Sequence, residues 1–366
     1  MRQSIRLGSI AGIPVGLNWG VLLIAAFYIF NLAVGILPAA VPNASTTGYW
    51  IAATAGIILF FGSILAHEFG HALVAQRNGI KVNAITLWFL GGVALLDKEA
   101  DNPGAEFRIA IAGPAVSVAL GVIFGALWLV ASPMVGGTLF TFILGYLAVI
   151  NIVLAVFNLI PAAPLDGGRV LAAALWWKSG EKNTARANAA KAGQVAGTGF
   201  MGLGVLLLLT GGNGFITIFL GWFIRSAALQ ERRRAERLDK VETADLAASV
   251  QPLVAPINGG ITVSGLESLS ASYPGPVAFP IAGPGGTSGL VSSISVHTTP
   301  PGERQSVFVA DLVVPWEQFT SARENEPMAV VLERAKTSGK DHVLVYDDSG
   351  RQVGYVALNG FLSAVH

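Results

Sequence analysis

Three long stretches of the chain contain no Asp, Glu, Lys or Arg: residues 7–67, 109–165 and 192–224. Each stretch is apolar and offers room for two membrane-spanning helices of about 20 residues. Small, polar or helix-breaking residues interrupt each stretch near its middle. We therefore predict a polytopic α-helical membrane protein with six transmembrane helices in three hairpins, near residues 14–38, 49–76, 106–131, 138–160, 190–210 and 214–230.

The charged residues of this part of the chain all fall between the predicted hairpins, so they share one side of the bilayer. Lys and Arg are in excess there, most clearly at residues 169–191 and 225–237. Because cytoplasmic loops carry the excess of Lys and Arg in membrane proteins, this side is predicted to be the cytoplasm. Both termini of the chain are therefore expected in the cytoplasm.

Composition supports a membrane protein and narrows the possible chemistry. Hydrophobic residues make up 53% of the chain, charged residues 12%, and the mean hydropathy is +0.61, which is outside the range of ordinary soluble domains. There is no cysteine, so disulfides are excluded and a metal must bind through nitrogen and oxygen. The net charge of +1 argues against a nucleic-acid partner, and the arginines at 232–234 are expected to contact anionic membrane lipid.

The run from residue 61 to 73 places two histidines and a glutamate in an otherwise apolar sequence. On a helix, His67 and His71 lie one turn apart on the same face and can bind one metal ion. Glu68 then stands beside the open coordination position. A chance match in a long chain is the alternative. However, a charged side chain in the middle of a span costs roughly 2.5–3.5 kcal/mol, so three ionisable residues together indicate function.

A third metal ligand is expected to be a carboxylate, because the remaining histidines lie in the C-terminal region. Asp166 is the first charged residue after the 109–165 stretch, as Glu68 is after the 7–67 stretch, so both should lie at similar depth. The prolines and glycines around Asp166 are expected to unwind the helix and free the backbone to hold the carboxylate. Asp166 is therefore the predicted third ligand.

Residues 79–101 are too few for another span and are rich in strand-forming residues, with a break at Gly91-Gly92. We predict a membrane-associated β-hairpin or re-entrant loop, where protein or a water-filled cavity satisfies the backbone. A loop at the membrane surface is the alternative. A hairpin edge could pair with an extended substrate, which makes Gly91 and Gly92 candidate substrate-binding residues.

The histidine motif and the segment around Asp166 together resemble the site-2 protease family of intramembrane zinc metalloproteases. The first motif is H-E-x-x-H, and the second, at residues 158–169, reads N-x-x-P-x-x-P-L-D-G-G-R. The resemblance implies one Zn²⁺ per chain, bound by His67, His71 and Asp166. It also implies that Glu68 is the catalytic acid and base.

The same resemblance implies a substrate and a location. Asn158 and Pro164 match family positions linked to substrate handling and site geometry. The expected reaction is hydrolysis of a peptide bond in or near the transmembrane segment of a single-span, membrane-anchored regulatory protein, such as an anti-sigma factor. The expected location is a bacterial or archaeal cell membrane, in contact with membrane lipid.

Residues 241–366 are soluble in character and contain an internal repeat, because Ala244-Asp245-Leu246 recurs as Ala310-Asp311-Leu312. The second copy is predicted to form a helix, a strand, a turn and a strand at residues 327–338, 342–346, 347–350 and 353–357. This pattern resembles a cytosolic α/β pair of cystathionine-β-synthase (CBS) domains. Some bacterial and archaeal site-2 proteases carry such a pair, and it would allow a homodimer.

CBS domains often bind adenosine nucleotides through a Thr or Ser and an acidic residue after the last strand. Residues 354–360 lack both, and residues 289–295 keep only the hydroxyl of Ser292. The sequence therefore favours weak or no nucleotide binding. A regulatory or substrate-contacting role without a ligand is the corresponding expectation.

The chain is thus expected to have a protease domain at 1–230, a basic linker helix at 231–240 and a regulatory pair at 241–366. The alternative function is a membrane transporter or channel regulated by its CBS pair, since intramembrane ionisable residues also line transport pathways. That alternative does not account for the spacing of the two histidines. Stoichiometric zinc that is lost on His67→Ala would exclude it.

Overall fold

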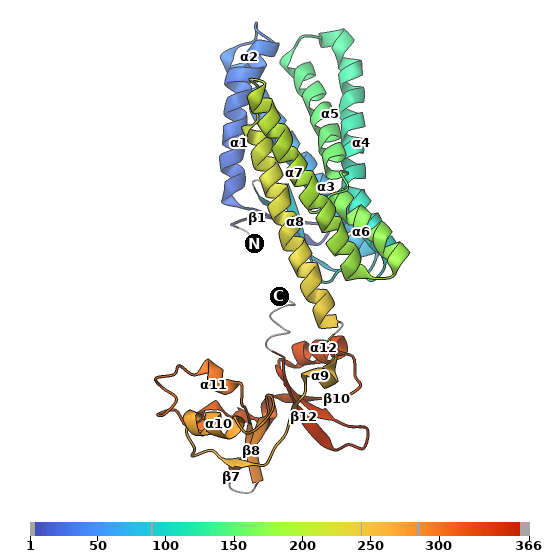
Figure 1. Cartoon of the computed structure of the whole chain (residues 1–366). Helices are drawn as coiled ribbons and strands as arrows, with labels where there is room; N and C mark the ends of the chain where they lie inside the picture. The colour runs from blue at the N-terminus through green and yellow to red at the C-terminus, as the bar shows by residue number, and fades with distance from the viewer. Residues whose placement is uncertain (1–3, 89–90, 243, 284–285, 359–366) are drawn as a thin grey trace. The chain divides into compact units, whose positions relative to one another are not determined.

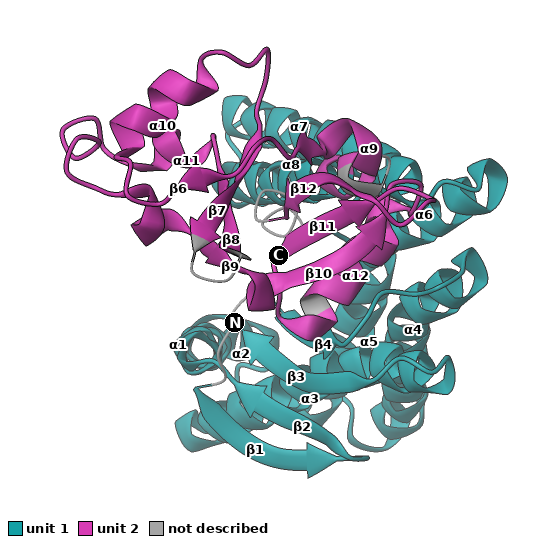
Figure 2. Cartoon of the chain, turned by 90° about the horizontal axis from the view of Figure 1, so that it is seen from below, with its two compact units in different colours: residues 1–235 teal, residues 236–366 magenta. Residues whose placement is uncertain are grey.

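The computed structural model describes residues 4–88, 91–242, 244–283 and 286–358. The chain divides into two compact units, residues 1–235 and 236–366 (Figure 2). Unit 1 is a bundle of long helices with one small sheet (Figure 1). Its helices are α1 (Trp19–Asn31), the π-helical turn η1 (Leu32–Ile36), α2 (Leu37–Ala40), α3 (Thr46–Arg77), α4 (Pro103–Val135), α5 (Leu139–Asn158), α6 (Asp166–Ser179), α7 (Lys182–Leu209) and α8 (Phe215–Glu242), whose last residues belong to unit 2.

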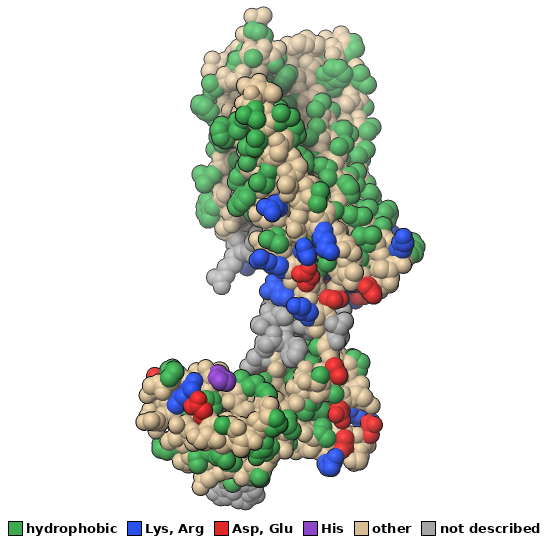
Figure 3. Space-filling model, in the orientation of Figure 1, with side chains coloured by type: hydrophobic (Ala, Val, Ile, Leu, Met, Phe, Trp, Pro, Cys, Tyr) green, Lys and Arg blue, Asp and Glu red, His purple; other side chains and the backbone are tan. Residues whose placement is uncertain are grey.

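Five of the described helices are long and apolar enough to cross a membrane: α1 with its continuation to Ala40, α3, α4, α5 and α7. Their outer side chains are largely hydrophobic, and on the face in Figure 3 the charged side chains of unit 1 gather toward one end of the helices.

Polar side chains cap the N-termini of four of these helices. Asn18, Ser45, Asn102 and Thr138 each accept a hydrogen bond from a backbone N–H two or three residues later, which satisfies N–H groups that the helix leaves free.

Helix α8 is not among these five. The sequence predicts a span at 214–230 and a separate linker helix at 231–240, whereas the structure has one continuous helix, Phe215–Glu242. Its charge-free part ends before Arg225, so the helix lacks an apolar window of spanning length. Among the described residues, the helices with the length and composition of a span are therefore the five named above.

The N-terminal residues differ from the prediction. The first span is predicted from residue 14, but Ile13–Leu17 is strand β2, which pairs with β1 (Ile5–Ile10). The physical reason is the alternation in this segment, where Ile13 and Val15 are buried and Pro14 between them is exposed. Helix α1 begins only after this strand.

The sheet of unit 1 has the order β1-β2-β3-β4, with β3 at Val82–Trp88 and β4 at Gly91–Leu96. Strands β3 and β4 pair antiparallel within the segment predicted as a hairpin or re-entrant loop. Residues 89 and 90, which belong to that segment, lie outside the described residues. Because β3 pairs with both β2 and β4, β4 forms an edge of this sheet.

Glycines allow the long helices of unit 1 to pack closely. A Cβ atom at Gly70 on α3 would lie 2.9 Å from the Ala112 carbonyl oxygen on α4. A Cβ at Gly121 on α4 would lie 3.2 Å from the Ala148 carbonyl oxygen on α5. Small residues at such positions let helix backbones approach in a membrane. Helix α4 thus packs against both α3 and α5, and it also contacts α6.

Unit 2 contains two four-stranded sheets with the orders β6-β7-β8-β9 and β10-β11-β12-β5. The strands are β5 (Gln251–Pro252), β6 (Ile257–Asn258), β7 (Ala278–Gly283), β8 (Gly286–Ser292), β9 (Val314–Pro315), β10 (Phe319–Arg323), β11 (His342–Tyr346) and β12 (Gln352–Ala357). The helices are α9 (Leu246–Ser249), α10 (Val263–Ser270), α11 (Ser295–Thr298), α12 (Met328–Ser338) and the short turns η2 (Val309–Leu312) and η3 (Trp316–Gln318). Helix α12 and strands β11 and β12 confirm the secondary structure predicted for the second copy.

The two sheets are copies of one arrangement. In each, a parallel strand pair (β6–β7 or β10–β11) flanks a helix in sequence, and an antiparallel strand follows (β8 or β12). The fourth strand is exchanged: β5, the first strand of the first copy, pairs with β12, and β9, the first strand of the second copy, pairs with β8. Each repeat therefore completes the sheet of the other.

Candidate metal centre

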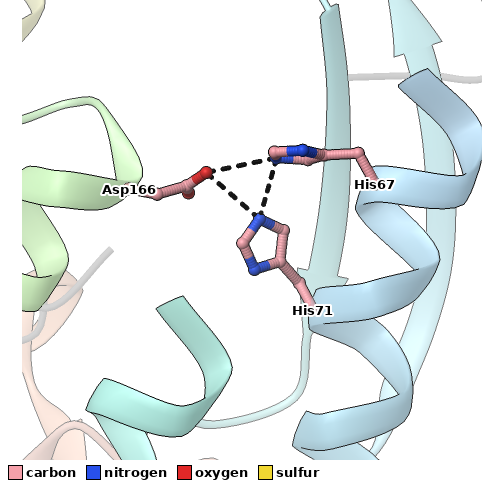
Figure 4. A group of neighbouring side chains, drawn as sticks. All are labelled: His67, His71 and Asp166. Carbon is pink, nitrogen blue, oxygen red and sulfur yellow. Dashed lines mark hydrogen bonds and ion pairs between the residues drawn. The ribbon is translucent and has the colours of Figure 1, made fainter. Parts of the chain in front are cut away.

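Helix α3 carries both predicted histidine ligands on one buried face. His67 and His71 have exposed fractions of 4% and 6%, and Asp166, the first residue of α6, points its carboxylate at both rings (Figure 4). Its Oδ2 atom lies 3.1 Å from His67 Nε2 and 3.3 Å from His71 Nε2. The two Nε2 atoms are 3.2 Å apart. The three residues that the sequence selects as ligands are thus brought together.

The geometry and the donor atoms of this group fit zinc. Atoms that bind one Zn²⁺ tetrahedrally at about 2.0–2.1 Å lie roughly 3.3 Å from one another. The triangle of Oδ2 and the two Nε2 atoms has sides of 3.1, 3.2 and 3.3 Å. Two imidazoles and one carboxylate also form a ligand set of catalytic zinc sites, which leaves a fourth position for water or substrate.

Helix α4 orients both imidazole rings through contacts with their Nδ1 atoms. His71 Nδ1 lies 2.7 Å from the Ile109 carbonyl oxygen, and because a carbonyl only accepts, this nitrogen carries the proton. The lone pair of His71 is then on Nε2, which faces Asp166. His67 Nδ1 lies 2.9 Å from the Ser117 hydroxyl, which is fully buried. Such partners fix the ring orientation and tautomer of metal-binding histidines.

Gly113 leaves the space in which the two imidazoles meet. A Cβ atom at this position would lie 2.2 Å from His71 Nε2 and 2.6 Å from His67 Nε2. Any side chain on α4 at this point would therefore collide with the atoms that face Asp166.

The backbone of β4 passes directly against Glu68. A Cβ atom at Gly92 would lie 2.2 Å from Glu68 Cγ and 2.9 Å from its Oε1. Gly91 has a φ of 143°, a conformation that other residues rarely adopt. Gly92, one of the four predicted substrate-binding residues, therefore lies against a residue of the predicted catalytic motif.

The other two predicted substrate-binding residues lie before α6. Asn158 is the last residue of α5, and Pro164 lies in the connection from α5 to α6. The hydrogen bonds of the described chain join neither residue to His67, His71 or Asp166, so their roles stay predictions. This connection folds back tightly on the start of α6, because a Cβ at Gly167 would lie 2.3 Å from the carbonyl oxygens of residues 159 and 160.

A cavity of about 400 Å³ adjoins these residues. Its walls include Ala94 of β4, Ile109 of α4, Pro164 and Arg169. It thus touches β4, the helix that orients the histidines and the helix that carries Asp166. Acidic and basic side chains also line it, among them Glu106 and Arg169, so the cavity is polar.

Ion pairs surround this cavity. Arg169 Nε lies 2.9 Å from Glu106 Oε1, and Glu99, in the connection from β4 to α4, contacts Lys182 at 3.1 Å and Arg186 at 2.5 Å. Burial opposes ionisation of Glu99, but Arg186 and Lys182 outweigh it and lower the pKa of Glu99 to about 2. This carboxylate is therefore ionised at neutral pH and ties the segment after β4 to the start of α7.

Sequence reasoning did not select Ile109, Ser117 or Glu106. A backbone carbonyl such as that of Ile109 carries no signal in the sequence. Ser117 and Glu106 are polar residues spaced by whole turns from Gly113 on one helix, but their partners are fixed only by tertiary packing. A helical-face analysis of residues 103–135 could have grouped them.

Comparisons with known proteins agree with this arrangement. The model of peptidase family M50 matches residues 55–137 and 131–201. Rip3 of Mycobacterium tuberculosis, named as a zinc metalloprotease, is 36% identical over 97% of this chain and 91% of its own length. The protein sll0528 of Synechocystis, also named as a zinc metalloprotease, is 33% identical over 97% of this chain and 93% of its length.

Among solved structures, the site-2 protease of Methanocaldococcus jannaschii is 33% identical and aligns with a TM-score of 0.45 over 62% of this chain and 94% of its own. The extent of the sequence similarity to the zinc metalloproteases, together with the M50 match across the histidine and aspartate motifs, settles the family. The chain belongs to peptidase family M50, the site-2 proteases, and is a multi-pass intramembrane zinc metalloprotease.

Proposed function

We propose that this protease binds its zinc through His67, His71 and Asp166 and uses Glu68 as the catalytic acid and base. The observation that carries the proposal is the convergence of two Nε2 atoms and one carboxylate oxygen within 3.3 Å of one another. Glu68 follows His67 directly on α3, on the side where β4 approaches. One Zn²⁺ per chain is the corresponding stoichiometry.

Each residue around the site is proposed to have a separate role in peptide hydrolysis. Zinc with three protein ligands supplies Lewis acidity and lowers the pKa of water at its open position to about 7. Glu68 takes a proton from the attacking water and returns it to the leaving nitrogen. The Asn158 amide is proposed to hydrogen-bond the substrate backbone or the developing oxyanion, and Pro164 to hold the connection that leads to Asp166.

The substrate is proposed to be the transmembrane segment of a single-span regulatory protein of the class that includes anti-sigma factors. A helical segment shields its peptide bonds, so it must unwind before cleavage, and unwound amides in hydrocarbon cost several kcal/mol each. Strand β4 offers an unpaired edge beside Glu68. We propose that the unwound substrate adds to this edge as a further strand.

The orientation follows from the charges. The Lys and Arg residues at the starts of α6 and α7 and along α8 favour the cytoplasm for the charged end of unit 1, with both termini on that side. The apolar start of α8 is proposed as a sixth, partial span. Its support is close packing on α7, where a Cβ at Gly197 would lie 2.6 Å from the Gly221 carbonyl oxygen.

For unit 2 we propose a regulatory pair of CBS-like domains on the cytoplasmic side, which can also join two chains. The support is the duplicated sheet with its exchanged strands. The Ser292 hydroxyl, which the sequence retains from the nucleotide pattern, donates to Gln251 Oε1 at 2.6 Å inside the unit. Residues 359 and 360, the other positions of interest, lie outside the described residues.

The test of the catalytic assignment separates the acid/base from the ligands. Glu68→Gln should keep zinc, because Glu68 is not a ligand, and should abolish cleavage of a single-span substrate in detergent or liposomes. His71→Ala and Asp166→Ala should lose both zinc and cleavage. Cleavage by Glu68→Gln at the rate of the unaltered enzyme would show that another group is the base.

A further inference from the structure

Helix α4 presents four buried residues on a single face: Glu106, Ile109, Gly113 and Ser117. Spacings of three and four residues place side chains on the same side of a helix. We call these four residues the α4 stripe. The stripe faces the metal centre, because Gly113 packs against the Nε2 atoms of both histidines.

Two members of the α4 stripe already hold metal-binding groups. The Ile109 carbonyl accepts from His71 at 2.7 Å, and the Ser117 hydroxyl pairs with His67 at 2.9 Å. Both histidine rings are therefore oriented by α4 rather than by their own helix alone. Neither contact reaches Asp166, which comes from α6.

Glu106, the remaining member of the stripe, reaches α6 instead. Its Oε1 accepts a hydrogen bond from Arg169 Nε at 2.9 Å, and Arg169 lies one turn after Asp166 on the same helix. The Glu106 side chain is 5% exposed and the Arg169 side chain 35%, so the carboxylate end of the pair is buried. A charge-assisted hydrogen bond in such surroundings holds its partners in a defined geometry.

The start of α6 is held by close backbone packing on the connection before it, where a Cβ at Gly168 would lie 2.2 Å from the Ala163 nitrogen, and by contacts with α4 and α7. Leu165, which precedes Asp166, provides no side-chain cap, and the connection before it contains no helix or strand. The contact of α6 with α4 is therefore one determinant of the position of the carboxylate relative to the two imidazoles, which α4 orients.

We propose that Glu106 and Arg169 form a positioning pair that sets Asp166 against His67 and His71, so that the α4 stripe aligns all three zinc ligands. The inference rests on the zinc site of the proposed function. In the described part of the chain, no hydrogen bond or ion pair joins either residue to the three ligand atoms, so the pair is proposed to act through the helices that carry it. Outer partners of this kind typically change metal affinity by about 10–100-fold when they are removed.

The test measures zinc affinity of the full-length protein in detergent, by competition with a chromophoric chelator. Arg169→Gln and Glu106→Gln should each raise the zinc dissociation constant by about 10–100-fold. The double variant should be no worse than the weaker single variant, because their mutual contact is already lost in each single variant. Glu106 also lies 4.0 Å from Arg186, and Arg169→Gln leaves that pair in place. Arg169→Lys, which keeps the charge, should recover part of the affinity.

Lys182→Gln is the matched control, because Lys182 makes an ion pair at the same cavity with Glu99 and does not touch the α4 stripe. Its zinc affinity should stay that of the unaltered protein. Unchanged affinity in both Arg169→Gln and Glu106→Gln, with zinc lost in Asp166→Ala, would overturn the positioning role alone. An equal loss in Lys182→Gln would also overturn it, since the effect would then be general. Tight zinc binding by Asp166→Ala would contradict the ligand assignment itself.

Discussion

At the scale of single residues, Gly92 lies directly against the side chain of Glu68. Gly92 leaves no room for a Cβ beside Glu68, because that atom would lie 2.2 Å from Glu68 Cγ. A side chain at position 92 must therefore displace either β4 or the proposed acid/base. Neither movement touches the three ligand atoms directly.

We predict that Gly92→Ala lowers kcat/KM by about 100-fold, the cost of a misplacement of about 1 Å in an active site. Zinc content should stay stoichiometric. Gly62→Ala is the matched control, because Gly62 lies on α3 with open space around its Cβ position, and it should cleave normally. Normal turnover by Gly92→Ala would mean that β4 does not constrain Glu68.

Single residues also show what the sequence could and could not predict. His67, Glu68 and His71 were identifiable because their chemistry depends on spacing within one helix. Asp166 was identifiable because a lone carboxylate after a long apolar stretch is unusual. Glu106 was not, since its partner lies 63 residues away on another helix and only packing brings the two together.

At the scale of elements, β4 is the strand on which the proposed mode of substrate binding depends. Strand β3 is paired on both sides, by β2 and β4. Its amides are therefore not available to a substrate. Among the described strands, β4 has a free edge in the sheet and lies against Glu68, so it is the strand proposed to accept the substrate.

A proline scan over Val93, Ala94, Leu95 and Leu96 tests this edge. Proline removes one amide donor at a time, and neighbouring amides of a strand point to opposite sides. We predict an alternating pattern, in which prolines on the outer edge lose cleavage while zinc stays bound. Prolines on the inner side should instead weaken the pairing with β3 and lower thermal stability. Normal cleavage at every position would place the substrate elsewhere.

Hydropathy predicted some of the helices and strands of unit 1 and missed others. The long helices were predictable because a charge-free stretch leaves few alternatives in a membrane. Strand β2 was not, because an apolar alternation such as Ile13 to Leu17 merges with the apolar helix after it. Helix α6 was missed because Gly167 and Gly168 at its start disfavour a helix, and tertiary contacts override that preference.

At the scale of the whole molecule, the repeat in unit 2 was predictable because its helix and strands follow clear local periods. The exchange of β5 and β9 was not, since each is only two residues long and its partner is in the other copy. The family, too, emerged from two distant motifs taken together. The repeat and the family were both recognised by comparing distant segments of the sequence with each other.

The full-length protein should bind AMP and ATP weakly or not at all in calorimetric titration. The retained hydroxyl of Ser292 is buried and donates to Gln251, so it is already engaged within the protein. Ser292→Ala should leave this result unchanged. Micromolar affinity for either nucleotide would contradict the prediction and would indicate control of proteolysis by the energy state of the cell.

The exchanged strands make the two halves of unit 2 interlocked rather than modular. A chain that lost the first copy together with β5 would leave β12 with a bare edge, and a chain cut before β9 would do the same to β8. Bare strand edges invite aggregation. Such a pair can be gained, lost or transplanted only as a whole, and a truncation within it removes support from the half that remains.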